Sequence, residues 1–245
     1  MVHLTSVLQL ISRPAAGMTT ETRIVNRLTP DQADTMLTLQ SGMNSKVDPA
    51  WQVARYPYLR AVVIEGAEAI EHHGWKWWKH QQHDLAQLQM ELIDIWHFML
   101  SELLLQFQGS LAPAAARLLG ETDGESAQSI DFDGKTYPLE ELDLVAKLEL
   151  LIGTSVARRI EIGLFASIMR DCRMDWDNLY RQYVGKNVLN FFRQDHGYQQ
   201  GTYRKSWHGR EDNEHLVEVL AALDARDAGF QEKLYAALQE RYHRE

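Results

Sequence analysis

The chain has 245 residues, of which 45% are hydrophobic and 24% are charged, a composition typical of a folded protein that buries a full core. The formal net charge of -9 argues against binding to nucleic acid polymers, because a surface that binds a duplex carries a large positive excess. The single cysteine excludes an internal disulfide, and no segment reaches the roughly 20 apolar residues that span a bilayer. We therefore expect a cytoplasmic protein that does not contact a membrane.

The sequence predicts a weakly ordered N-terminal segment, residues 1–27, followed by one domain over residues 28–245. The first helix of this domain has a clear start. Thr29 supplies a capping hydroxyl, Pro30 stands at the first helical position, and Asp31 places an acid in the first turn. We expect this helix to continue to about Lys46.

Two further helices are predicted before the middle of the chain. Residues 58–73 carry apolar side chains at helical spacing, and Gly74 is placed to end this helix. Residues 84–107 are apolar on nearly every face apart from a few acids. A helix of this kind lies in the middle of a bundle.

The helical pattern weakens between residues 108 and 138, where glycines and prolines interrupt it. We interpret this stretch as a peripheral or mobile insertion. Residues 139–172 return to a strongly apolar helical register, and Gly153 or Gly163 is expected to divide them into two helices.

The remaining segments complete an all-α protein. Residues 175–193 begin with a plausible cap and continue the bundle, residues 196–212 are typical of a loop, and two amphipathic helices follow. The alternating pattern of strands and the glycine-rich loop that binds phosphates are both missing from the sequence. We therefore predict a helical bundle with a peripheral insertion.

Four acidic residues on the second and third helices form two pairs. Glu65 and Glu68 are three residues apart, as are Glu91 and Asp94, so each pair lies on one helical face. The connection between the two helices is long enough for them to run antiparallel, so the pairs can meet in the bundle. One pair stands within an otherwise apolar helix, where unpaired carboxylates are costly.

A divalent cation would resolve this cost, so the sequence predicts a buried carboxylate metal site. Oxygen ligands favour Mg²⁺, or Mn²⁺, over Zn²⁺. A di-iron site would need a Glu-x-x-His pair from each of two helices, and Asp94 with His97 offers only one such spacing. The alternative is that the acids are solvated surface residues paired with Lys or Arg.

With these acids, the sequence resembles the all-α dimeric dUTPases of trypanosomatids, bacteria and phages, which are related to MazG-type nucleotide pyrophosphatases. The resemblance covers residues 28–213. It is carried by the two acid pairs together with Met36–Gln40, Asn44, Arg60–Ala61, Trp75–Lys79, Glu91–Phe98, Lys186–Gln194, Gly197–Tyr198, Gly201–Tyr203 and Glu211–Asn213.

The resemblance implies a role for particular residues. The four acids would hold Mg²⁺, with Glu65 also orienting the attacking water. Side chains implied to contact the nucleotide are Gln40 and Asn44 at the uracil, His97 and Phe98 beside the deoxyribose, Trp77 and Lys79 in the pocket wall, and Lys186, Asn190, Arg193, Tyr198, Lys205 and Asn213 around the phosphates.

Charge supports a phosphate site near the end of the chain. Between Lys186 and Arg210 there are five Lys or Arg and one Asp, a local charge of +4 in a chain whose net charge is -9. This local inversion suits a triphosphate, although a solvated basic loop would have the same composition.

The resemblance implies a homodimer that hydrolyses dUTP, and dUDP, to dUMP with release of pyrophosphate or phosphate, keeping uracil out of DNA. One alternative is a related pyrophosphatase that acts on dCTP or on a broader set of nucleotides. The alternative from another class is a non-catalytic helical interaction protein.

Overall fold

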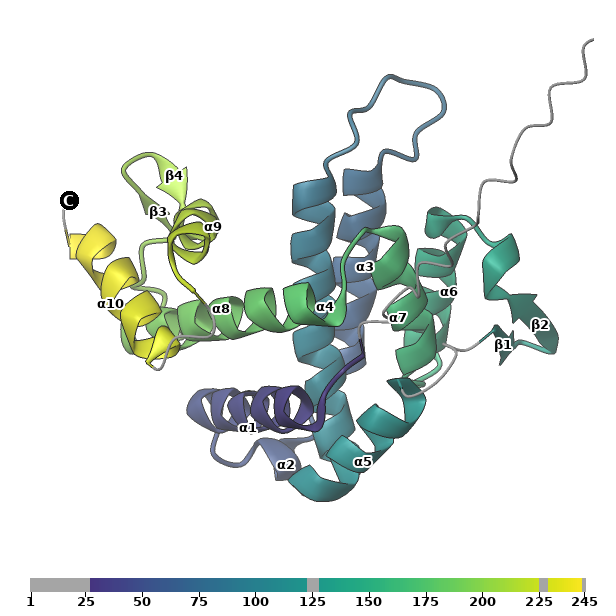
Figure 1. Ribbon diagram of the computed structural model, residues 1–245, viewed down its shortest axis with the longest axis horizontal. Helices are drawn as coiled ribbons and strands as arrows, with labels where there is room; N and C mark the ends of the chain where they lie inside the picture. Colours follow the sequence, from purple (N-terminus) through teal and green to yellow (C-terminus); the bar gives the residue numbers. More distant parts are fainter. Residues whose placement is uncertain (1–26, 123–127, 225–228, 244–245) are drawn as a thin grey trace, which may run out of the picture.

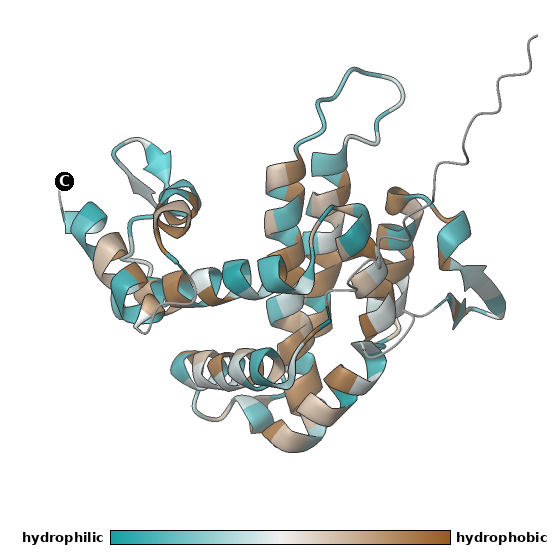
Figure 2. Ribbon diagram, in the orientation of Figure 1, coloured by the Kyte–Doolittle hydropathy of each residue, from teal (hydrophilic) through white to brown (hydrophobic). Residues whose placement is uncertain are grey.

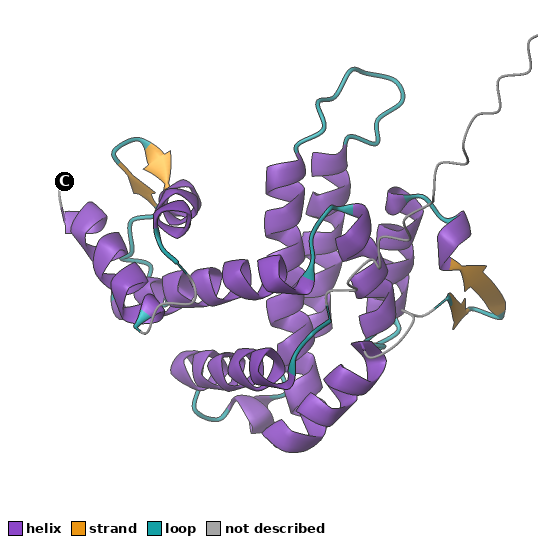
Figure 3. Cartoon of the chain, viewed as in Figure 1, coloured by secondary structure: helices purple, strands orange, loops and turns teal. Residues whose placement is uncertain are grey.

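The computed structural model describes residues 27–122, 128–224 and 229–243. In these ranges the chain forms ten α-helices, one short 3₁₀ helix and two small hairpins (Figure 3). The hairpins pair β1 (Ser129–Phe132) with β2 (Lys135–Pro138) and β3 (Ser206–Trp207) with β4 (Arg210–Glu211). The predicted all-α fold is confirmed. The predicted N-terminal segment falls almost wholly outside the described residues.

Two antiparallel helices stand at the centre of the protein (Figure 1). Helix α3 (Tyr58–His73) packs along α4 (Leu85–Gln106), and α6 (Leu144–Val156) packs against α3. Gly74 ends α3 with φ of 84°, a conformation that costs glycine little. Asp84 caps α4 by accepting a hydrogen bond from the backbone of Gln87. Most of the residues of α4 are buried, as its apolar sequence predicts.

Helix α1 (Pro30–Val47) begins with the predicted cap. The Thr29 hydroxyl accepts from the Gln32 backbone, and the Gln32 side chain accepts from the Thr29 backbone in return. This helix lies across α4 and also contacts α5 and α8. A short helix, α2 (Trp51–Ala54), follows it and buries Trp51.

The stretch 108–138 consists of two different parts. Helix α5 (Leu111–Thr122) packs against α1 and α7 and buries Ala114, Ala115 and Leu118. The hairpin of β1 and β2 lies at the edge of the molecule (Figure 1). The first part therefore contributes to the core, whereas the second is peripheral.

After the 3₁₀ turn (Leu139–Glu141), the apolar segment divides into α6 and α7 (Ile162–Asp171). The predicted break is present and lies between Gly153 and Gly163. In the break, Arg158 has a φ of 64°. Helix α7 is almost wholly buried.

Helix α8 (Trp176–Asp195) connects the central bundle to the C-terminal part. Asp175 caps it. Helices α9 (Asp212–Ala222) and α10 (Phe230–His243) pack against its second half, away from α3 and α4 (Figure 1). An aromatic cluster that includes Phe192, Trp207 and Tyr242 joins these elements.

Apolar residues of the helices turn towards one another, and polar residues face outward (Figure 2). The core is continuous from α1 to α10. Within the described ranges, no helix combines the length and the hydropathy that a membrane-crossing segment needs.

Candidate active site

Three carboxylates from the two central helices meet in the bundle. Glu65 lies on α3, Glu91 and Asp94 lie on α4, and each offers an oxygen within 4.8 Å of the others. Glu91 is buried, and the other two are partly buried. Glu68 is exposed one turn further along α3. The i, i+3 spacing on two antiparallel helices brings these side chains together.

The positive side chains of the protein do not balance the negative charges of these acids. Burial, followed by the charges of Asp94, Glu91 and Glu68, raises the pKa of Glu65 to about 8. Burial, followed by the charges of Asp94 and Glu68, raises the pKa of Glu91 to about 7. Glu65 and Glu91 also share a hydrogen bond. The carboxylates are therefore crowded at a cost in the free energy of folding.

The donor set fits a divalent cation. Oxygens that bind one Mg²⁺ at about 2.1 Å are about 3 to 4 Å apart, and the three carboxylate oxygens lie within 4.8 Å of one another. The fourth acid, Glu68, is close enough for its charge to raise the pKa of Glu65 and Glu91. A cation held here would offset both the repulsion between the acids and the cost of burying their charges.

Two basic side chains border the acids. Lys186 of α8 is 3% exposed, and its Nζ lies 3.0 Å from Oδ2 of Asp94. The ring of His72, one turn beyond Glu68 on α3, places Nε2 at 3.4 Å from Oε1 of Glu91. The charge of Lys186 lowers the pKa of Glu91, but less than burial raises it.

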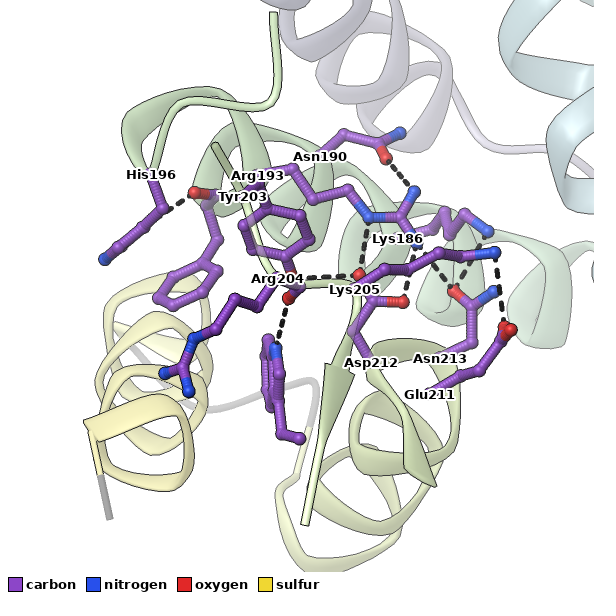
Figure 4. Close-up of polar contacts among 12 residues, drawn as sticks. Lys186, Asn190, Arg193, His196, Tyr203, Arg204, Lys205, Glu211, Asp212 and Asn213 are labelled. Atoms are coloured by element: carbon purple, nitrogen blue, oxygen red, sulfur yellow. Dashed lines mark hydrogen bonds and ion pairs between the residues drawn. The ribbon is translucent and has the colours of Figure 1, made fainter. Parts of the chain in front are cut away.

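A polar cluster extends from Lys186 along α8 (Figure 4). Lys186 donates to Oδ1 of Asn213 at 3.1 Å. Arg193 donates to both oxygens of Asp212 at 2.8 Å, and to Asn190 at 3.2 Å. The structure thus brings together four residues that the sequence assigns to the phosphates: Lys186, Asn190, Arg193 and Asn213.

Asp212 is fully buried, and it holds the Arg193 guanidinium in place. Burial raises the pKa of Asp212, but the hydrogen bonds and charge of Arg193 outweigh it and hold that pKa below its usual value. The hydroxyl of Tyr203 donates to the same carboxylate at 2.8 Å. The side chain of Arg193 is thereby fixed, with one N–H 3.3 Å from Asn213.

Two residues assigned to the phosphates are at the border of this cluster. Lys205 is exposed and pairs with Glu211 at 3.2 Å. Tyr198 is half exposed, and the guanidinium of Arg193 lies 5.8 Å from the centre of its ring.

On the other side of the acids, α1 and α4 enclose a group of buried polar side chains. Gln40 donates from Nε2 to Oδ1 of Asn44 at 3.0 Å and to Oγ of Ser101 at 2.8 Å. Its Oε1 lies 2.8 Å from Nδ1 of His97 and accepts from the hydroxyl of Tyr183 at 2.9 Å. Gln40 thus joins α1, α4 and α8.

Atoms of this group remain without a partner. Nδ2 of Asn44, Nε2 of His97 and Nδ2 of Asn187 are buried and make no hydrogen bond within the described chain. Burial, with a smaller effect of Lys186, lowers the pKa of His97 to about 3, so the ring is neutral. Buried polar atoms of this kind are rare and costly, which indicates a polar ligand.

The remaining predicted residues lie further from this group. Phe98 is partly buried against the core. Trp77 and Lys79 are in the loop that extends beyond α3 and α4 (Figure 1). Trp77 is 86% exposed and contacts Trp75 and Trp78. Within one chain, the structure does not bring this loop to the acids.

The sequence interpretation gave no role to His72, Ser101 and Tyr183, and it named Asp212 only as part of the Glu211–Asn213 motif. Ser101 and His97 are four residues apart on α4, just as Gln40 and Asn44 are on α1. A polar pair at this spacing in the otherwise apolar α4 is the signal that could have identified Ser101. Tyr183 is one of several aromatic residues in α8, a helix that mixes aromatic and polar side chains, so its sequence context carries no comparable signal.

One side of α4 connects the acids with the buried amides. Glu91, Asp94, His97 and Ser101 are separated by three or four residues, so they form one line along the helix. The line spans about 15 Å at 1.5 Å per residue. An extended nucleotide has a comparable length.

Comparison with known proteins agrees with this arrangement. A family model described as dUTPase matches residues 32–198, which is more than half of the chain. The match includes the three clustered acids, the buried amides and the whole of α8. No curated protein matches the sequence.

Proposed function

The chain belongs to the all-α dUTPase family and has dUTP diphosphatase activity, and from this premise we propose that it hydrolyses dUTP with Mg²⁺, held by Glu65, Glu68, Glu91 and Asp94. Mn²⁺ has the same preference for oxygen ligands and would replace it. Family membership favours an enzyme over a non-catalytic helical interaction protein.

The observation that carries the proposal is the line of side chains on α4. Three carboxylate oxygens lie within 4.8 Å at one end, and buried polar atoms without a partner lie at the other. In our proposal the triphosphate lies at the acids and the uracil lies at Gln40 and Asn44. His97 and Phe98 then lie beside the deoxyribose.

The proposed reaction is attack by water on a phosphoanhydride bond. A bound divalent cation supplies positive charge to the phosphate oxygens and acidifies a water molecule. In this proposal Glu65, whose pKa is raised to about 8 by burial and by the neighbouring acids, orients the attacking water, as the resemblance to the family implies. The products are dUMP and pyrophosphate, and dUDP would be cleaved in the same way.

Cations and amides of α8 and α9 hold the phosphates in this proposal. Lys186 is a compact charge beside Asp94, and Arg193 presents a planar group that is kept in place by Asp212. A guanidinium and an ammonium hold phosphate oxygens differently, the first with directed N–H groups and the second as a point charge. Asn190 and Asn213 contribute amide groups to the phosphate site. Tyr198 and Lys205 form the solvent-exposed side of this site.

We also propose that the chain forms a homodimer. Large apolar side chains are exposed on α3, the α3–α4 loop and α6: Ile64, Trp75, Trp77, Trp78 and Val156. Such side chains are typical of surfaces that another protein covers. A contact of Trp77 and Lys79 with the nucleotide requires a second copy of the chain or a movement of the loop.

The decisive experiment is a pyrophosphate-release assay with dUTP, dCTP, dTTP and UTP, in Mg²⁺ and in EDTA. We expect hydrolysis of dUTP that EDTA abolishes and Mg²⁺ restores. Glu91→Gln should reduce kcat by at least a hundredfold, while Glu141→Gln, a change of an exposed acid outside the site, should have no effect. Equal turnover of dCTP would contradict the uracil preference, and activity that persists in EDTA would contradict the metal requirement.

A further inference from the structure

Asn187 of α8 carries one of the buried polar atoms that have no partner. The residue is 1% exposed, and its Nδ2 makes no hydrogen bond within the described chain. Burial raises the pKa of Tyr183, and Asn187 acts in the opposite direction with a smaller effect, so the amide lies near the hydroxyl of Tyr183. Because Nδ2 carries two N–H groups, at least one of them is left unpaired, at a cost to the folded protein.

Helix α8 directs Asn187 towards α1. One turn before Asn187, the hydroxyl of Tyr183 donates to Oε1 of Gln40 at 2.9 Å. One turn after Asn187, the ring of Phe191 faces Gly42 of α1, where an added Cβ would lie 3.6 Å from Cζ of the ring. Residues four apart share one face of a helix, so Asn187 faces α1 between these two contacts.

The unpaired amide of Asn44 lies on the same stretch of α1. Nε2 of Gln40 donates to Oδ1 of Asn44 at 3.0 Å, so the free atom of Asn44 is its donor, Nδ2, which is buried without a partner. The oxygen of Gln40 contacts the hydroxyl of Tyr183, beside which Asn187 lies. The two unpaired donors therefore flank the two ends of the Gln40 amide.

The amide of Gln40 is itself fully used by contacts within the protein. Its two N–H groups are donated to Asn44 and to Ser101. Its oxygen accepts from the hydroxyl of Tyr183 and faces Nδ1 of His97. A base placed here therefore finds its donors on the neighbouring amides.

Two amide donors match the two carbonyl groups of uracil. Each carbonyl gives up its contact with water on entering a buried site, so each needs a donor from the protein. Cytosine keeps one of these carbonyls and has an amino group, itself a donor, in place of the other. One of the two protein donors would then face a donor, and a site with mismatched buried groups rejects such a base strongly.

We propose that Asn187 is a further substrate-binding residue, which donates a hydrogen bond to one carbonyl of uracil while Asn44 donates to the other. This inference rests on the proposed function, because it adds a second donor for the base to that site. It also accounts for the unpaired amide of Asn187, which forms its missing bond with the substrate.

The test uses two analogues of dUTP, in which sulfur replaces the carbonyl oxygen at C2 or at C4, because sulfur accepts a hydrogen bond more weakly than oxygen. With the full-length enzyme and Mg²⁺, we expect the wild type to have a kcat/KM for each analogue roughly tenfold below that for dUTP, about the effect of one buried hydrogen bond. Asn187→Ala should lose the preference for oxygen at one carbonyl and keep it at the other. Asn44→Ala should show the reverse.

Two controls separate a contact with the base from general damage to the protein. Asn178→Ala changes an exposed asparagine of the same helix and should keep both preferences. Pyrophosphate lacks the base, so calorimetry in Mg²⁺ should give equal affinities of the wild type and Asn187→Ala for it, whereas their affinities for dUMP should differ by roughly tenfold. Asn187→Leu removes the donor and fills the space of the amide, and it repeats these measurements if Asn187→Ala does not fold.

Three results would overturn the inference: a wild type that distinguishes oxygen from sulfur at one carbonyl or at neither, an Asn187→Ala enzyme that keeps both preferences, or one that loses both. The first of these needs no variant. A wild type that does not hydrolyse dUTP would contradict the proposed function instead. In that case the binding of dUMP would still test the contact of Asn187 with the base.

Discussion

The ammonium group of Lys186 lies 3.0 Å from the carboxylate of Asp94, which joins the basic cluster of α8 to the acids of α3 and α4. Lys186 is buried at 3% exposure, so this contact is little screened by solvent. In the proposed function the same ammonium group also contacts a phosphate of the substrate. The ammonium group would therefore compete with a metal cation for the carboxylate of Asp94. Towards the substrate it would act together with the cation, because both attract the phosphate oxygens.

Lys186→Met separates these two effects. Without the ammonium group, we expect Mg²⁺ to bind more tightly to the nucleotide-free protein, because a competing positive charge is removed. The value of kcat/KM for dUTP should fall by about a hundredfold, since a phosphate contact is lost. Calorimetry and steady-state kinetics measure the two effects, with Lys46→Met as a control on an exposed ion pair. A parallel loss of metal affinity would contradict this interpretation.

The metal-free protein should become less stable as pH rises. The pKa of Glu65 is raised to about 8 in the folded chain, whereas an unfolded glutamate has a pKa of about 4.3. The folded state therefore binds more protons between these values, and its free energy of unfolding falls as pH increases through this range. Urea denaturation in EDTA at pH 6 and pH 8.5 measures this slope.

Glu65→Gln should reduce that slope and increase stability at pH 8.5, while abolishing dUTP hydrolysis. Mg²⁺ should also reduce the slope in the wild type, because it compensates the charge of the carboxylates. A stability that rises with pH in EDTA would show that the acids are not crowded in the metal-free protein.

The pair of Arg193 and Asp212 should stabilise the attachment of α9 to α8. Asp212→Ala leaves the guanidinium without its buried partner, and we expect a loss of about 3 kcal/mol in the free energy of unfolding. Tyr203→Phe removes only one hydrogen bond to the same carboxylate, so its cost should be about 1 kcal/mol. Urea denaturation in Mg²⁺ compares the two. Equal losses would mean that the ion pair adds nothing beyond a neutral contact.

Gly185 permits the close contact between α8 and α9. A Cβ at this position would lie 2.7 Å from two methyl carbons of Leu220, so Gly185→Ala should destabilise the protein by about 1 to 3 kcal/mol. Gly120→Ala is the matched control, because its Cβ meets nothing within 4 Å and it lies in α5. This control should be stabilising by up to about 1 kcal/mol. Thermal denaturation distinguishes these opposite signs.

The sequence alone was sufficient for most of the longer helices and for the acid pairs. The spacing of apolar residues, the cap at Thr29 and the glycine at residue 74 gave the positions of α1 and α3 closely, because these signals act between residues near in sequence. The i, i+3 spacing of Glu91 and Asp94 likewise places both carboxylates on one helical face in any fold that keeps the helix. Helix α5 was obscured by its flanking glycines, although its alanines pack against α1.

The tertiary structure decided how those helices face one another. It joined Gln40, His97 and Ser101 to Tyr183, which is 143 residues from Gln40 in sequence, and it paired Arg193 with Asp212. It also placed Trp77 in an exposed loop, away from the acids of its own chain. Such pairings depend on the packing of whole helices, and no local pattern encodes the partner of a side chain that lies on another helix.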